Sequence, residues 1–121
     1  MYSETLLEHF HHPRNVGEIA EASVVVEVSN PVCGDLMKLW AAVRGGRIED
    51  VKFKAAGCVP SVACGSWITE AILHKPPHEL SALTPSDVAA GLGGLPPASH
   101  HAAVLAVDAL KRLLAQMQNP T

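Results

Sequence analysis

The sequence lacks the clusters of basic residues that nucleic-acid-binding proteins carry. Its nine Lys and Arg residues are scattered along 121 residues, and the formal net charge is −3. Because binding a phosphate backbone requires cations gathered on one surface, we expect no nucleic-acid partner.

A long hydrophobic run is also absent. Hydrophobic residues make up 48% of the chain, which is enough for one core, but no apolar stretch approaches the roughly 20 residues that a membrane-spanning helix needs. The N-terminal segment carries Glu4 and Glu8 and lacks the basic start of a targeting signal. We therefore expect one domain spanning residues 1–121, located in the cytoplasm and without a membrane partner.

Motifs of common enzyme classes are missing as well. The chain contains no GxSxG, HExxH, Walker or Rossmann pattern, so hydrolase, nucleotide-dependent and redox-enzyme functions have no motif to support them. We expect a protein without its own catalytic activity. In a reducing compartment, we interpret Cys33, Cys58 and Cys64 as thiols or metal ligands rather than as a disulfide framework.

What the sequence does contain is a regular order of structural elements. Residue patterning predicts a helix over 2–12 capped by Ser3, strands over 22–28, 36–43 and 48–56, a helix from a start at Ser61 to 74, short helices over 78–83 and 85–92, and a long helix over 99–116. This order predicts an α+β fold, in which a three-stranded antiparallel sheet is packed by an N-terminal helix and several C-terminal helices.

Spacing within the long C-terminal helix predicts which face is buried. Val104, Val107, Leu110, Leu114 and Met117 recur three and four residues apart, so they are expected to line one face of that helix.

Metal-ligand chemistry is concentrated in three short segments, of which the first contains Cys33, Gly34 and Asp35. In an extended chain, Cys33 and Asp35 lie on the same side, and a thiolate beside a carboxylate forms a mixed pair of ligands. The alternative is that Asp35 caps a turn and Cys33 is a small core residue. This motif alone does not separate the two interpretations.

The second segment contains Cys58 and Cys64. Cys58 follows a predicted strand and precedes a predicted helix start, where free backbone N–H groups favour a thiolate that can bind a metal or accept sulfur. Cys64 either approaches Cys58 from the first helical turn or packs inside it, as buried cysteines often do.

The third segment is His100-His101, at the start of the long helix, where imidazole suits both zinc and iron. The N-terminal histidines His9, His11 and His12 have no cysteine or carboxylate at ligand spacing, and we interpret them as surface residues.

Several motifs in order resemble those of the IscU/NifU N-terminal family of iron–sulfur cluster scaffolds. The matching segments are Tyr2 with residues 8–10 and 13–17, the NPxCGD-like segment 30–35, segment 48–54 with Gly57 and Cys58, Leu95-Pro96-Pro97, and His101 with residues 105–110. The resemblance implies a scaffold that carries a cluster, with 2Fe–2S expected, or a zinc ion. It also implies a cysteine desulfurase and recipient apo iron–sulfur proteins as partners, and a DnaK-type chaperone that binds Leu95, Pro96 and Pro97.

The resemblance also implies a ligand set and shows where this chain departs from it. Cys33, Asp35, Cys58 and His101 match family ligands, but the third family cysteine, which follows the histidine, is Ala102 here. Either Cys64 replaces that thiolate, or the four matching residues suffice. The Lys that follows the chaperone motif in the family is also absent, which puts chaperone recognition in doubt.

Three functions remain open at this point: a scaffold or carrier for iron–sulfur clusters, a zinc-bound acceptor of persulfide sulfur from a desulfurase, and a degenerate paralogue that acts only as an interaction module. The motif match makes the scaffold our first hypothesis. The missing third cysteine strengthens the zinc-bound alternative, because cluster assembly needs thiolates more than zinc binding does.

Overall fold

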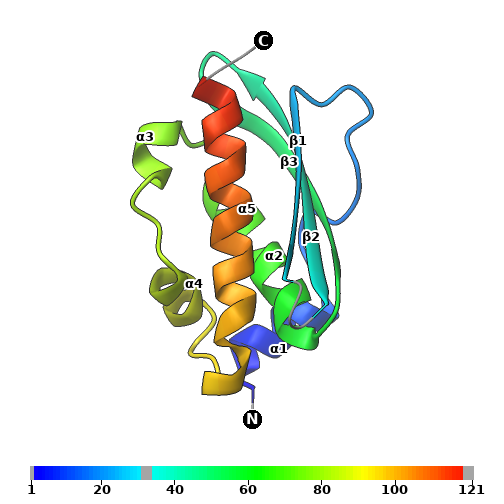
Figure 1. The fold of residues 1–121 in the computed structure, drawn as a ribbon, viewed down its shortest axis with the longest axis vertical. Coiled ribbons are helices and arrows are strands. Elements are labelled where there is room, and N and C mark those ends of the chain that lie inside the picture. Colours follow the sequence, from blue (N-terminus) through cyan, green and yellow to red (C-terminus); the bar gives the residue numbers. More distant parts are fainter. Residues whose placement is uncertain (1, 31–33, 119–121) are drawn as a thin grey trace.

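The computed structural model describes residues 2–30 and 34–118 and confirms the predicted α+β fold. Its elements are α1 (Glu4–His11), β1 (Val24–Asn30), β2 (Asp35–Arg44), β3 (Arg47–Ala56), α2 (Val59–Ile72), α3 (Pro77–Leu80), α4 (Pro85–Gly91), a short 3₁₀ helix η1 (Pro97–Ser99) and α5 (His100–Gln118). Figure 1 shows α5 running along the sheet, with α3 and α4 on its other side. None of the helices in the described part of the chain is long and apolar enough to cross a membrane.

The sheet has the strand order β1-β2-β3, and both pairs are antiparallel. Along β1, buried and exposed residues alternate, as expected for a strand with one face against a core. In β3, Ile48, Val51 and Phe53 are buried on the inner face, and Lys54 is exposed on the other. The inner face of this strand therefore carries its apolar residues.

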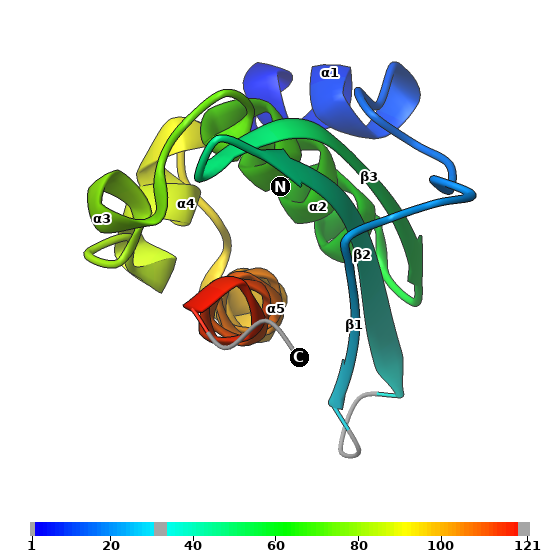
Figure 2. The ribbon, with the colours of Figure 1, turned by 90° about the horizontal axis from the view of Figure 1, so that it is seen from above.

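Helices α2 and α5 cover the inner face of the sheet, as the view along α5 shows (Figure 2). Helix α5 also contacts α4, so it is buried over a wide arc that small residues such as Ala106 and Ala109 help to fill. Val107, Leu110 and Leu114 are buried as predicted, but Val104 is 36% exposed. The prediction for Val104 was wrong because the sheet, α2 and α4 pack against the other sides of α5.

The start of α2 differs from the prediction. The helix begins at Val59 with Cys58 as its N-cap residue, and Ser61 lies inside the first turn. Pro60 occupies the second helical position, where a missing N–H costs nothing. Cys64 consequently lies about a turn and a half into the helix and is fully buried.

Helix α1 is fixed to α2 by a histidine that we had interpreted as a surface residue. His9 is only 6% exposed, and its Nδ1 lies 2.7 Å from Oγ of Ser66. The surface interpretation was wrong for His9 because the side of α1 that carries His9 and Leu6 packs on α2. Ser3 caps α1 as predicted and also donates a hydrogen bond to the carbonyl of Leu92.

Candidate metal centre

Three elements that are distant in sequence bring one potential ligand each to the same point. Asp35 is the first residue of β2, Cys58 is the N-cap of α2, and His101 is the second residue of α5. One ligand atom from each residue lies within 4.8 Å of the other two. The structure thus brings together three of the side chains that the sequence singled out.

The carboxylate of Asp35 is at the centre of this group. Its Oδ2 lies 3.0 Å from Nε2 of His101 and 3.3 Å from Sγ of Cys58, and Sγ lies 3.7 Å from Nε2. The backbone N–H of Cys58 donates a hydrogen bond to Oδ1 of Asp35 at 3.3 Å. Asp35 is 3% exposed, whereas Cys58 and His101 are partly exposed, so the group opens to solvent on the sulfur and imidazole side.

A glycine makes room for the buried carboxylate. Gly57 has φ +131°, a conformation that residues with a side chain rarely adopt, and a Cβ there would lie 2.6 Å from Cγ of Asp35 and closer still to Oδ1. The turn between β3 and α2 therefore requires glycine for two reasons. With glycine at this position, the carboxylate of Asp35 can lie against the N-terminus of α2.

The environment of Asp35 favours its ionised form. Burial raises the pKa of its carboxyl group, but hydrogen bonds from Ser61, Cys58 and His101 outweigh that effect and hold the pKa below its ordinary value. At neutral pH Asp35 is therefore a carboxylate and ready to act as a ligand.

The imidazole of His101 is held with one nitrogen turned towards Asp35. Its Nδ1 lies 3.1 Å from the carbonyl oxygen of Ala98, which can only accept, so Nδ1 carries the proton. Its Nε2 then faces Oδ2 of Asp35 at 3.0 Å. A cation between Nε2 and Oδ2 interacts favourably with both atoms, and the Nδ1–H bond to the carbonyl of Ala98 is the usual second-shell contact of a metal-bound histidine.

The separations of the three ligand atoms suit a small tetrahedral ion. Zinc–ligand bonds of about 2.0–2.3 Å at tetrahedral angles place neighbouring ligand atoms roughly 3.4 Å apart. The observed separations are 3.0, 3.3 and 3.7 Å. A metal ion bound at this point displaces the proton of the Cys58 thiol, because a cysteine ligand is a thiolate. The residues present fit a bound metal.

Cys64 does not join this group. Its side chain is 0% exposed in the core, and burial, with a smaller contribution from the nearby Cys58, raises its pKa to about 12. In the metal-free protein it is therefore a protonated thiol at neutral pH. The structure packs Cys64 in the core near Cys58, and its role as a replacement ligand stays a prediction.

Two further residues that the sequence analysis singled out are Cys33 and Ala102. Cys33 lies outside the described residues, so its role as a ligand stays a prediction. Ala102 follows His101 and is fully buried in the core beside the centre.

One residue of the group was not found from the sequence. Ser61 donates a hydrogen bond from Oγ to Oδ2 of Asp35 at 2.9 Å, and Oγ also lies 3.3 Å from Sγ of Cys58. A helix that started at Ser61, as the sequence predicts, would use this hydroxyl as its cap. With the N-cap at Cys58, the third helical residue faces Asp35. The spacing of three residues between Cys58 and Ser61 was the available signal.

Comparison with known proteins shows the family of the chain. Residues 1–120 match the family described as NifU-like N terminal domain. The chain belongs to that family. It is 46% identical over 114 residues to an Archaeoglobus fulgidus protein named iron-sulfur cluster assembly scaffold protein IscU 1, with 94% of this chain and 74% of that protein covered. It is 38% identical over 122 residues to the Escherichia coli K12 protein of the same description, covering 98% and 94% of the two chains.

The fold is also that of a solved family structure. The N-terminal NifU-like protein from Brucella abortus superposes with a TM-score of 0.81 at 19% identity, covering 98% of this chain and 95% of that one. At this identity the likeness concerns the fold, which the NifU-like family member shares.

Proposed function

We propose that this chain is a scaffold and carrier on which an iron–sulfur cluster is assembled and from which it is handed on. The observation that carries the proposal is the convergence of Asp35, Cys58 and His101 at one partly open point of the fold. Relatives named as iron–sulfur cluster assembly scaffolds support it. The cluster is cargo, residues 1–121 act as one domain, and the protein has no catalytic activity of its own.

The three converging side chains suit a cluster that is bound only temporarily. Iron–sulfur clusters are usually held by cysteine thiolates, and here Cys58 is joined by a carboxylate and an imidazole. Cys33 is proposed as a further thiolate ligand, with a 2Fe–2S cluster as the cargo. Because Ala102 supplies no thiolate, the cluster is held by fewer sulfur ligands than in a closed four-cysteine site. A ligand set that mixes thiolate, carboxylate and imidazole favours release of the cluster to a recipient protein.

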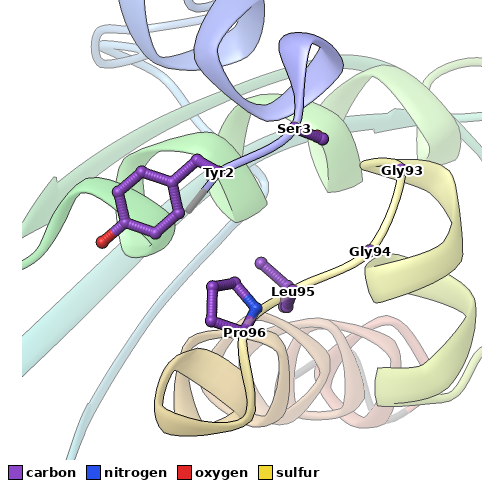
Figure 3. Close-up of a pocket in the computed structure, with 6 residues that line it drawn as sticks. All are labelled: Tyr2, Ser3, Gly93, Gly94, Leu95 and Pro96. Atoms are coloured by element: carbon purple, nitrogen blue, oxygen red, sulfur yellow. The ribbon is translucent and has the colours of Figure 1, made fainter.

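The proposal implies several partners in a reducing compartment such as the cytoplasm, where thiols remain free. A cysteine desulfurase supplies sulfur at the partly exposed Cys58, and apo iron–sulfur proteins receive the cluster. A DnaK-type chaperone is proposed to bind Leu95, Pro96 and Pro97. Leu95 and Pro96 line a pocket of about 420 Å³ together with Tyr2, Ser3, Gly93 and Gly94, and Figure 3 shows the Tyr2 ring across the opening from Pro96.

A second candidate function is supported by the geometry of the same residues. Ligand atoms 3.0–3.7 Å apart suit a single zinc ion. In that case zinc orders the ends of β2, α2 and α5, and a cysteine accepts persulfide sulfur and passes it on.

The metal and acid-labile sulfide content of protein purified without air separates these functions. Iron with equimolar sulfide and a brown colour supports the scaffold. One zinc without sulfide, in protein that forms no coloured cluster with added iron and sulfide, supports the zinc-bound sulfur acceptor. Protein that binds neither metal supports the degenerate paralogue and contradicts both proposals.

A further inference from the structure

The side chain of Ser61 lies between two of the proposed ligands. It belongs to the first turn of α2 and is 0% exposed. Its hydroxyl donates to Oδ2 of Asp35 at 2.9 Å and lies 3.3 Å from Sγ of Cys58. A single buried hydroxyl therefore contacts both the carboxylate and the thiol of the centre.

The helix backbone does not use this hydroxyl. The N–H of Ser61 is bonded to the carbonyl of Cys58 at 3.1 Å, and Cys58 is the N-cap without a side-chain cap bond. A buried hydroxyl costs free energy unless it is paired, and here the partner is Asp35. The Ser61 hydroxyl therefore interacts with the metal centre and does not cap the helix.

Ser61 differs from the other donors around Oδ2 of Asp35. When a metal binds Sγ of Cys58 and Nε2 of His101, those atoms give up any proton that they share with the carboxylate. The Ser61 hydroxyl keeps its proton. Of the three side chains that contact Oδ2, Ser61 is thus the donor whose bond to Asp35 is compatible with both the metal-free and the metal-bound centre.

We propose that Ser61 is a positioning residue of the metal centre. It holds Oδ2 of Asp35 at the place where Asp35, Cys58 and His101 bind one metal ion together. This inference rests on the proposed function, because it assumes that these residues bind a metal. It assigns Ser61 a role through Asp35, not as a ligand.

A double-mutant cycle on zinc affinity tests this role. Zinc affinity is measured by competition with a chromophoric chelator for the wild type, Ser61→Ala, Asp35→Ala and the double variant. Outer-shell partners contribute about 10- to 100-fold to metal affinity, so Ser61→Ala is expected to weaken zinc binding by that factor. In the Asp35→Ala background, the same change is expected to have no further effect.

Ser66 provides the matched control. It is also a fully buried serine of α2, but its hydroxyl is bonded to His9 and to the backbone N–H of Arg14. Ser66→Ala is expected to lower the melting temperature and to leave zinc affinity unchanged. A general effect of removing a buried hydroxyl from α2 would weaken zinc binding in both variants.

The absorption spectrum of the Co²⁺-bound protein reports directly on the ligands. A substitution that affected only the stability of the fold would leave this spectrum unchanged. Ser61→Ala is expected to change the d–d bands as Asp35→Ala does, while the thiolate-to-cobalt band of Cys58 remains. Unchanged zinc affinity with an unchanged d–d spectrum overturns the role of Ser61, as does a Ser61→Ala effect that persists in full without Asp35. A wild-type protein that binds neither zinc nor cobalt refutes the metal centre itself.

Discussion

Oδ2 of Asp35 lies 3.0 Å from Nε2 of His101, so the first residue of β2 and the first turn of α5 meet at one carboxylate. Cys58 joins them from the N-cap of α2. Because α2 and α5 both pack on the same face of the sheet, the three positions are fixed by the core rather than by a loop (Figure 2). The relative positions of Asp35, Cys58 and His101 are therefore set by the packing of the core.

Removing the carboxylate of Asp35 is expected to make the cluster more persistent. In the proposed scaffold, Asp35 is the oxygen ligand that eases release. After reconstitution with iron and sulfide without air, Asp35→Ala protein should lose its visible absorbance more slowly than wild type when air is admitted. A faster loss would show that Asp35 stabilises the cluster instead.

Gly57→Ala is expected to disrupt both stability and the centre. The new Cβ overlaps the Asp35 carboxylate, and φ +131° is strained for alanine. We expect a loss of about 1–3 kcal/mol in the free energy of unfolding, and loss of zinc binding.

Gly45→Ala is the control for Gly57→Ala. Gly45 has φ +59° in the β2–β3 turn, and a Cβ there meets no other atom within 4 Å. This variant should lose stability through backbone strain and keep its zinc affinity. Equal zinc affinity in both variants would show that Gly57 acts only on the backbone.

The order of elements could be predicted from the sequence, because strand alternation and turn residues are local signals. The family resemblance singled out Asp35, Cys58 and His101, which the structure brings together. The position of Ser61 could not be predicted. Its orientation depends on α2 starting at Val59, and a shift of the N-cap by three residues changes which side chain faces Asp35. The burial of His9 depends on how α1 packs on α2, which no pattern within α1 specifies.

Stability is expected to fall as the pH drops below about 6.5, through His9. Burial lowers the pKa of His9, and the Arg14 guanidinium lowers it further, against the opposing effects of Glu70 and Glu8. The unfolded chain therefore binds a proton at His9 before the folded chain does. The stabilising contribution is complete above the unfolded pKa of about 6.5 and is lost as the pH falls towards the lower pKa of the folded state.

Urea unfolding of metal-free protein between pH 8 and pH 5.5 measures this effect. His9→Asn keeps an acceptor near Ser66 and removes the titrating group, so its free energy of unfolding should change less with pH than that of the wild type. The control is His78→Asn at an exposed position in α3, which should retain the wild-type slope. An unchanged slope in His9→Asn would contradict the assignment.

Cys58 and Cys64 are expected to differ in reactivity. Cys58 is partly exposed, whereas Cys64 is fully buried with a pKa of about 12. Iodoacetamide added to folded, metal-free protein at pH 7.5 should alkylate Cys58 and leave Cys64 unmodified until urea is added, as peptide mass spectrometry will show. Added zinc should protect Cys58. Rapid alkylation of Cys64 in folded protein would contradict its buried position.

The central claim is that Cys58, together with Asp35 and His101, holds the cluster. Its most direct test is reconstitution with iron and sulfide without air, followed by desalting and measurement of bound iron, acid-labile sulfide and the visible spectrum. The account predicts a coloured protein with equimolar iron and sulfide for the wild type and for Cys64→Ala, and loss of both from Cys58→Ala. Retention of a full cluster by Cys58→Ala, or its loss from Cys64→Ala with the fold intact, would contradict the account.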